Sequence, residues 1–86
     1  MSKSFSEVVK SVVDQVKTTK GGVKKLIEAT GKSAGLITHW KTGRYIPTLR
    51  VQVEFITKSN NLIQELRKEE KDNLEKYEEI SNSITA

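Results

Sequence analysis

Apolar residues near the N-terminus recur three and four positions apart, which places them on one stripe of a helix. That stripe consists of valines: Val8, Val9, Val12, Val13 and Val16. Ser4 followed by Glu7 has the spacing of a capping box, in which each side chain satisfies a backbone N–H of the other. The pattern predicts a first helix from Ser4 to about Thr19.

Glycines delimit two shorter helices after the first. Gly21-Gly22 breaks the first helix, and a second is expected over about 23–30, with an apolar side made of Val23, Leu26 and Ile27. Gly31 stands where a helix ends and the chain turns with positive φ. Ser33 is suited to cap the N-terminus of a third helix, expected over 33–42.

The third helix, which Gly43 ends, has two unlike sides. At 100° per residue, its apolar stripe consists of Leu36, Ile37 and Trp40, and we assign Trp40 to the core. The opposite side is small and polar, with Gly35, Thr38 and Thr42 flanked by Ala34, His39 and Lys41. A solvated helix face more often carries longer charged side chains. This side would therefore enter a groove without steric obstruction.

The segment 49–58 fits two patterns. Alternation of apolar and polar residues, as in a strand, runs through Leu49, Val51, Val53 and Phe55. A helical stripe is also present, made of Leu49, Val53 and Ile56. Pro47 suits the first turn of a helix and the preceding segments are helical, so we choose a helix here.

The last third of the chain reads as a separate, acidic helix. Ser59-Asn60-Asn61 predicts a break, and Asn61 with Gln64 resembles another cap. Strong helix formers follow to about Ser81, where we expect the end to fray. Their apolar side is broken, so three arrangements remain: pairing with a second copy, folding back on the core, or disorder. We favour a partial helix with a role in self-association or partner contact.

These elements predict an all-α fold, a small bundle of about five helices whose C-terminal helix is extended or partly frayed. We expect two parts, a domain at 1–60 and an acidic helix or tail at 61–86. Residues 1–60 carry 11 Lys and Arg against 4 Asp and Glu, a net charge of +7. Residues 61–86 carry 4 against 7, a net charge of −3. A basic globular part beside an acidic one suggests a polyanionic partner for the first.

Composition narrows the function classes. The chain of 86 residues has no cysteine and one histidine, which excludes a disulfide scaffold, a thiolate metal site and a multi-histidine centre. It lacks an apolar run long enough for a membrane span and the apolar stretch of a signal peptide, so we expect a soluble intracellular protein. We find no paired nucleophile and base and no Gly-rich phosphate loop. We therefore expect no enzyme activity, no cofactor, no metal and no small-molecule ligand.

Two short helices joined by a glycine turn, the second with a flat polar outer side, form the pattern of a helix-turn-helix. Two stretches carry a resemblance: Gly-Gly-Val-Lys-Lys-Leu-Ile-Glu-Ala-Thr-Gly-Lys-Ser and Trp-Lys-Thr-Gly-Arg-Tyr-Ile-Pro. They resemble the Cro/repressor-like helix-turn-helix proteins of temperate bacteriophages and prophages. The resemblance covers residues 21–58 and is strongest in the second stretch.

The resemblance implies roles for particular residues. In that family the early residues of the recognition helix read bases, which here are Ala34, Gly35, Thr38 and His39. Phosphate contacts would come from Lys32, Thr42, Arg44 and Tyr45. Charge and position add Lys24, which opens the second helix, and Lys41, at the edge of the outer side, as further phosphate candidates. The chain departs from the family at Ile27, where alanine is usual, and at Lys32, where an apolar residue is usual.

We therefore expect a sequence-specific DNA-binding transcriptional regulator that inserts helix 33–42 in the major groove. Its partner would be double-stranded DNA, bound as a homodimer or cooperative multimer in the cytoplasm of a bacterial host cell, with no membrane contact. One alternative is a phage excision or architectural DNA-binding factor. Another is a protein-interaction module such as an antitoxin or anti-repressor, whose corresponding face would more often carry large apolar residues.

Overall fold

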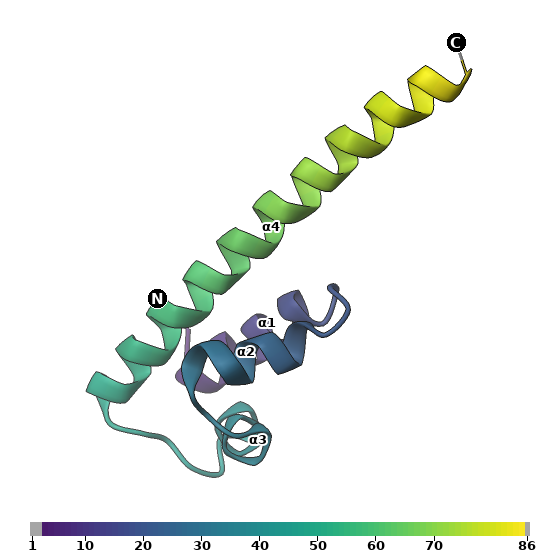
Figure 1. Ribbon diagram of the computed structural model, residues 1–86. Coiled ribbons are helices and arrows are strands. Elements are labelled where there is room, and N and C mark those ends of the chain that lie inside the picture. The colour runs from purple at the N-terminus through teal and green to yellow at the C-terminus, as the bar shows by residue number, and fades with distance from the viewer. Residues whose placement is uncertain (1–2, 86) are drawn as a thin grey trace.

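Residues 3–85, the part of the chain that the computed structural model describes, form four helices (Figure 1). They are α1 (Phe5–Val16), α2 (Gly22–Thr30), α3 (Ala34–Thr42) and α4 (Leu49–Thr85). The first three helices gather beside the beginning of α4, and the rest of α4 extends away from them as a single rod (Figure 1). We call residues 3–66 the head and residues 67–85 the tail. The expected all-α fold is confirmed.

Three aromatic side chains from three different helices form the centre of the core. Phe5 of α1, Trp40 of α3 and Phe55 of α4 meet edge to face, with ring centroids 5.2–6.0 Å apart. Trp40 is 1% exposed, so its assignment to the core is confirmed. Each such aromatic pair adds about 0.5–1.5 kcal/mol beyond the area it buries. The cluster therefore fixes α3 against both α1 and α4.

The serines and glycines expected at the helix ends stand there, and the capping box forms in one direction, from the Glu7 N–H to the Ser4 hydroxyl. The Ser4 hydroxyl accepts the Glu7 N–H at 3.2 Å, and the Ser33 hydroxyl accepts the Leu36 N–H at 3.2 Å. Gly31 and Gly43 end α2 and α3 with φ of +69° and +76°. Because side chains other than glycine rarely adopt this conformation, the two glycines set where both short helices stop.

α1 ends at Val16, three residues before the expected end at Thr19. The reason is the close approach of the next helix. A Cβ atom at Gly22 would lie 1.8 Å from the Val16 carbonyl oxygen, so only glycine fits there. The chain turns at once through residues 17–21, with the Thr19 N–H donating to Val16 O and the Gly22 N–H donating to Thr19 O.

The predicted break at Ser59-Asn60-Asn61, with Asn61 as a new cap, is wrong. α4 runs through these residues without interruption, so the expected fourth and fifth helices are one. Ser and Asn each disfavour a helix interior by no more than about 0.7 kcal/mol. Against that, α4 buries apolar side chains worth about 1.5–3 kcal/mol each on both sides of the expected break: Phe55, Leu62, Ile63 and Leu66. Burial against the head therefore outweighs the local preference.

Two further expectations at the ends of α4 need correction. Pro47 does not lie in the first helical turn but two residues before Leu49, and its carbonyl oxygen accepts a hydrogen bond from the Gln52 side chain at 2.9 Å. At the other end the helix does not fray at Ser81 but continues to Thr85, whose hydroxyl donates to Ser81 O at 3.0 Å. In the described part of the chain, none of the helices combines the length and apolar character needed to cross a membrane.

Candidate nucleic-acid interface

α3 is held at both ends and along one side. Ser33 caps its N-terminus and Gly43 ends it, while Ile37 (5% exposed) and Trp40 are buried in the head. Its principal packing partner is α1, on which the head is built. The nine residues of α3 are therefore a fixed rod whose other side faces outward.

The outward side of α3 carries the side chains that the sequence marked as base-reading. All four of these residues are exposed: Ala34, Gly35, Thr38 and His39. Thr42, in the last turn of the helix, is exposed as well. Each of these five side chains is small or polar. The structure thus places the predicted base-reading residues together on one accessible helical surface, which we call the outer face (Ala34, Gly35, Thr38, His39 and Thr42).

The Thr38 side chain is oriented by its own helix. Its hydroxyl donates to the Ala34 carbonyl oxygen at 2.9 Å, so its proton is engaged. The hydroxyl oxygen remains an acceptor, and the methyl group presents an apolar contact. Thr38 can therefore accept a hydrogen bond from an exocyclic amino group on a base or touch a thymine methyl group.

A small apolar groove of about 80 Å³ runs beside the outer face, between α3 and the beginning of α2. Its lining includes Ala34, Thr38 and Lys41 from α3 and Val23 from α2. Val23 was expected on the buried side of the second helix, but it is 37% exposed and only Leu26 of that predicted trio is fully buried. Burial depends on how α2 sits on the head, which periodicity alone does not give. Val23 is thus a surface residue beside α3 that sequence reasoning missed.

Lys41 stands apart from the other predicted phosphate contacts on α3. It is half-buried and lines the groove toward α2, because at 100° per residue it lies about 40° from the buried Ile37. Its long aliphatic stem can cover apolar surface while the ammonium group reaches water. The outer face itself therefore lacks a lysine among its five residues.

The remaining predicted phosphate contacts lie at the ends of the two short helices. Lys32 is half-buried in the turn directly before the Ser33 cap, and its N–H donates to the Thr30 hydroxyl at 3.4 Å. Arg44 and Tyr45 are exposed directly after Gly43. Positive groups therefore stand immediately before and after α3, as a helix lying between two phosphate strands requires.

Lys24 belongs to the exposed beginning of α2. The helix starts after Gly21, which offers no side-chain cap, and the Gly22 N–H donates to Thr19 O at 2.9 Å, while Val23 and Lys24 are exposed. A helix N-terminus with an adjacent cation favours negative charge nearby. Val23, next to Lys24 at this end of α2, lines the groove beside the outer face of α3.

The turn that joins α2 and α3 is internally bonded. The buried Thr30 hydroxyl donates to Leu26 O at 2.8 Å and accepts the Lys32 N–H, and Gly31 supplies the left-handed conformation. After α3, the His39 carbonyl oxygen accepts from the Arg44 N–H at 3.0 Å and from the Thr42 hydroxyl at 3.2 Å. These hydrogen bonds hold the backbone of Lys32 and Arg44 in position on either side of α3.

No protein family, no curated protein and no solved structure matches this chain. A functional assignment for it therefore depends on the geometry of α3 and on the distribution of charge.

Proposed function

We propose that this protein is a sequence-specific DNA-binding regulator of transcription that inserts α3 into the major groove. The observation that carries the proposal is the contrast between the two sides of α3. Its bulky side, Ile37 and Trp40, is buried, and its outer face is exposed and composed of small or polar side chains. A reading helix needs this arrangement, because its backbone must approach the bases closely while the domain holds it in place.

The dimensions of α3 suit the groove. An α-helix with its side chains is about 10–12 Å across, and the major groove is about 12 Å wide. Gly35 and Ala34 reduce the diameter of α3 on the outer face, so the helix axis can lie deep in the groove. A protein-interaction module would more often place large apolar side chains at these positions.

Base discrimination would come chiefly from two side chains. Thr38 offers an acceptor oxygen and a methyl group, and His39, also exposed, offers a ring nitrogen at the flank of the outer face. Ala34 and Gly35 make no bidentate hydrogen bonds, so they contribute thymine-methyl contact and close approach. Part of the selectivity then depends on the shape of the duplex itself.

Affinity would come from the basic residues around α3. Residues 1–60 carry a net charge of +7, and Lys32 and Arg44 flank α3 at its two ends. Contacts of such residues with phosphates release counterions, so binding falls steeply as salt rises. A regulator of this kind would act as a homodimer or cooperative multimer on double-stranded DNA in the cytoplasm of a bacterial host cell.

The test is a set of three single variants measured on two duplexes, one selected by the protein from a random pool and one scrambled. Thr38→Val keeps the shape and removes the hydroxyl, and His39→Ala removes the ring. Each is expected to lower the preference for the selected duplex by about 1–3 kcal/mol. Arg44→Ala is expected to weaken both duplexes alike, because a phosphate contact carries no sequence information.

Fluorescence anisotropy titrations at several salt concentrations give all of these quantities. Circular dichroism of each variant confirms that the head remains folded. The proposal fails if the random pool shows no enrichment, or if Thr38→Val and His39→Ala leave the preference between the two duplexes unchanged.

A further inference from the structure

The tail carries an exposed apolar stripe. Side chains that would normally be buried are largely open to solvent there: Tyr77 is 70% exposed, Ile80 59% and Ile84 79%. We call these three residues the tail stripe. They line one shallow hollow together with Ser81 and Thr85. Leu74, three residues before Tyr77, is 57% exposed. A cluster of this kind on an otherwise charged helix marks a surface that another molecule covers.

The tail stripe continues the face by which α4 packs on the head. At 100° per residue, Tyr77, Ile80 and Ile84 all lie within about 40° of Leu66, which is buried. Phe55 and Ser59, also buried, lie within the same range. One face of α4 is therefore covered by α1 and α2 in the head and uncovered in the tail.

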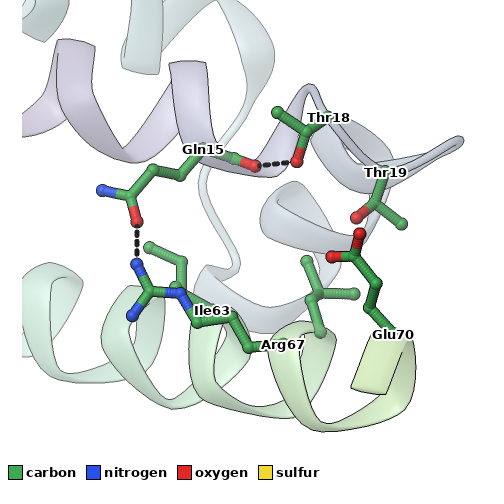
Figure 2. Close-up of a pocket in the computed structure, with 7 residues that line it drawn as sticks. Gln15, Thr18, Thr19, Ile63, Arg67 and Glu70 are labelled. Carbon is green, nitrogen blue, oxygen red and sulfur yellow. Dashed lines mark hydrogen bonds between the residues drawn. The ribbon is translucent and has the colours of Figure 1, made fainter. Parts of the chain in front are cut away.

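Between the covered and uncovered parts lies an open groove of about 210 Å³ (Figure 2). Gln15 of α1 and Thr18 of the turn after it form one wall, and the Arg67 guanidinium of α4 donates to Gln15 Oε1 at 2.7 Å. Thr19 and Glu70 point toward one another at its far end. An adjoining hollow extends the groove along α4 past Leu66 to Asn73. The groove thus leads directly onto the tail stripe.

The charge of the tail selects its partner. The segment 67–71 carries three basic and two acidic residues, a net charge of +1, and 72–85 carries one basic and four acidic, a net charge of −3. An acidic end disfavours both DNA and an anionic membrane surface as the covering partner. Two tails running in opposite directions bring the basic beginning of each to the acidic end of the other. Two parallel tails would set like charges together.

The head decides between the same two orientations. In a parallel pair the second α4 would have to follow the shared face down to Phe55 and Ser59. That space is filled by α1 and α2 (Figure 1). An antiparallel second helix instead runs from the groove outward, and its own head lies beyond the far end of the tail.

We propose that the tail stripe docks with a second copy of this chain, the two tails running antiparallel and the end of each entering the groove of the other. A single antiparallel register pairs all three residues of the tail stripe with the second copy, because in such a register the residue numbers of every facing pair add up to the same value. The facing positions are Leu66 with Ile84 of the partner subunit, Glu70 with Ile80 of the partner subunit, and Asn73 with Tyr77 of the partner subunit. Glu70 and Asn73 are polar residues within this seam, and such residues specify register at a cost in stability.

The end of the groove is electrostatically suited to this docking. Lys17 and Lys20 are exposed in the turn after α1, beside the groove residues Thr18 and Thr19. The segment 72–85 has a net charge of −3. The tail of the second copy therefore brings an acidic segment toward a basic turn.

The first test is the mass of the full-length chain in solution without DNA, by sedimentation equilibrium over a range of concentrations. We expect a dimer of the 9.7 kDa chain. Ile80→Glu is expected to raise the dimer dissociation constant at least about tenfold, since it adds a charge to the seam. Asn82→Glu, on the opposite side of the helix, is the matched control and should leave it unchanged.

Orientation is tested by cross-linking, since the chain has no cysteine of its own. Glu70→Cys and Ile80→Cys are made separately and oxidised alone or mixed. In the antiparallel register, the mixture forms a disulfide-linked dimer and each variant alone does not, because identical positions are about 15 Å apart along the helix. A monomer at every concentration overturns the proposal, as does cross-linking of each variant with itself. So does a dimer that Val53→Glu, on the exposed beginning of α4, dissociates while Ile80→Glu does not.

None of these measurements uses DNA. A failure here leaves the assignment of α3 as a reading helix intact, and a failure of DNA binding leaves the dimer intact.

Discussion

The head and the tail are stabilised in different ways although α4 belongs to both. In the head, side chains from three helices meet around Trp40, and the buried face of α4 is covered along its length. In the tail, every side chain from Arg67 to Thr85 is exposed except the half-buried Ser81. In proteins most of the stability of a helix comes from packing of its apolar face against other elements. The same helix is therefore held by tertiary packing in one half and, in our proposal, by a second copy in the other.

The exposed helical surfaces of the head and the tail differ in their chemistry. The outer face of α3 is small and polar, so it suits a partner that is itself polar and grooved. The tail stripe is large and apolar, so it suits a partner that also buries apolar surface. Both are helical surfaces free on one side, and residue size and polarity alone assign them to different partners.

The head and the tail should differ most when one aromatic side chain is removed from each. Trp40→Ala is expected to lower the free energy of unfolding by about 3–5 kcal/mol, because it empties the centre of the core. Tyr77→Ala, measured at a concentration where the chain is monomeric, is expected to change it by less than about 0.5 kcal/mol. Urea denaturation followed by circular dichroism gives both values. Comparable losses for the two variants would show that the tail is packed against the head.

Gly22 stands where two segments of the head approach closely, whereas Gly35 stands on the open outer face of α3. Gly22→Ala is expected to lower the free energy of unfolding by about 3 kcal/mol, since its Cβ would overlap the Val16 carbonyl oxygen. The added Cβ of Gly35→Ala meets open space among the described residues. This variant is expected to raise the free energy of unfolding by about 0.5–1 kcal/mol, because alanine lowers the conformational entropy of the unfolded chain.

Thermal unfolding of the two glycine variants beside the wild type tests this contrast. If Gly35→Ala destabilised the head as strongly as Gly22→Ala, the outer face of α3 would not be open. DNA affinity measured on the same variants sharpens the result, because added bulk on the outer face is expected to weaken binding while stability rises.

The smallest effect concerns the serine cap of α3. Ser33→Ala is expected to cost about 1 kcal/mol, because the Leu36 N–H loses its acceptor. Ser83→Ala in the exposed tail makes the same chemical change away from any helix start and is expected to be within about 0.5 kcal/mol of the wild type. Chemical denaturation resolves the difference. Equal values for the two variants would mean that the Ser33 cap contributes nothing to holding α3.

Much of the head follows from signals that are local in the sequence. Ser4 and Ser33 mark helix starts, and Gly31 and Gly43 mark helix ends, because the chemistry of caps and left-handed glycines acts within a few residues. The outer face of α3 also follows, since the rotation per residue alone sets which side chains oppose Trp40. These predictions needed no knowledge of what packs against what.

The features that the sequence did not give are tertiary. Ser59 lies in the middle of α4 because the burial of apolar side chains before and after it outweighs the low helix propensity of serine. Val23 is exposed because of the way α2 rests on the head, although its spacing matches that of the buried Leu26. Gly22 has to be glycine because a Cβ atom there would overlap the Val16 carbonyl oxygen, and the spacing of apolar residues in the sequence does not reveal this contact.

Insertion of α3 into the major groove is tested most directly by methylation interference on the duplex that the protein selects. Methyl groups are placed at guanine N7, in the major groove, or at adenine N3, in the minor groove. If α3 lies in the major groove, methylation at guanine N7 within the site blocks binding and methylation at adenine N3 does not. Interference confined to adenine N3, or none at either position, would contradict the account.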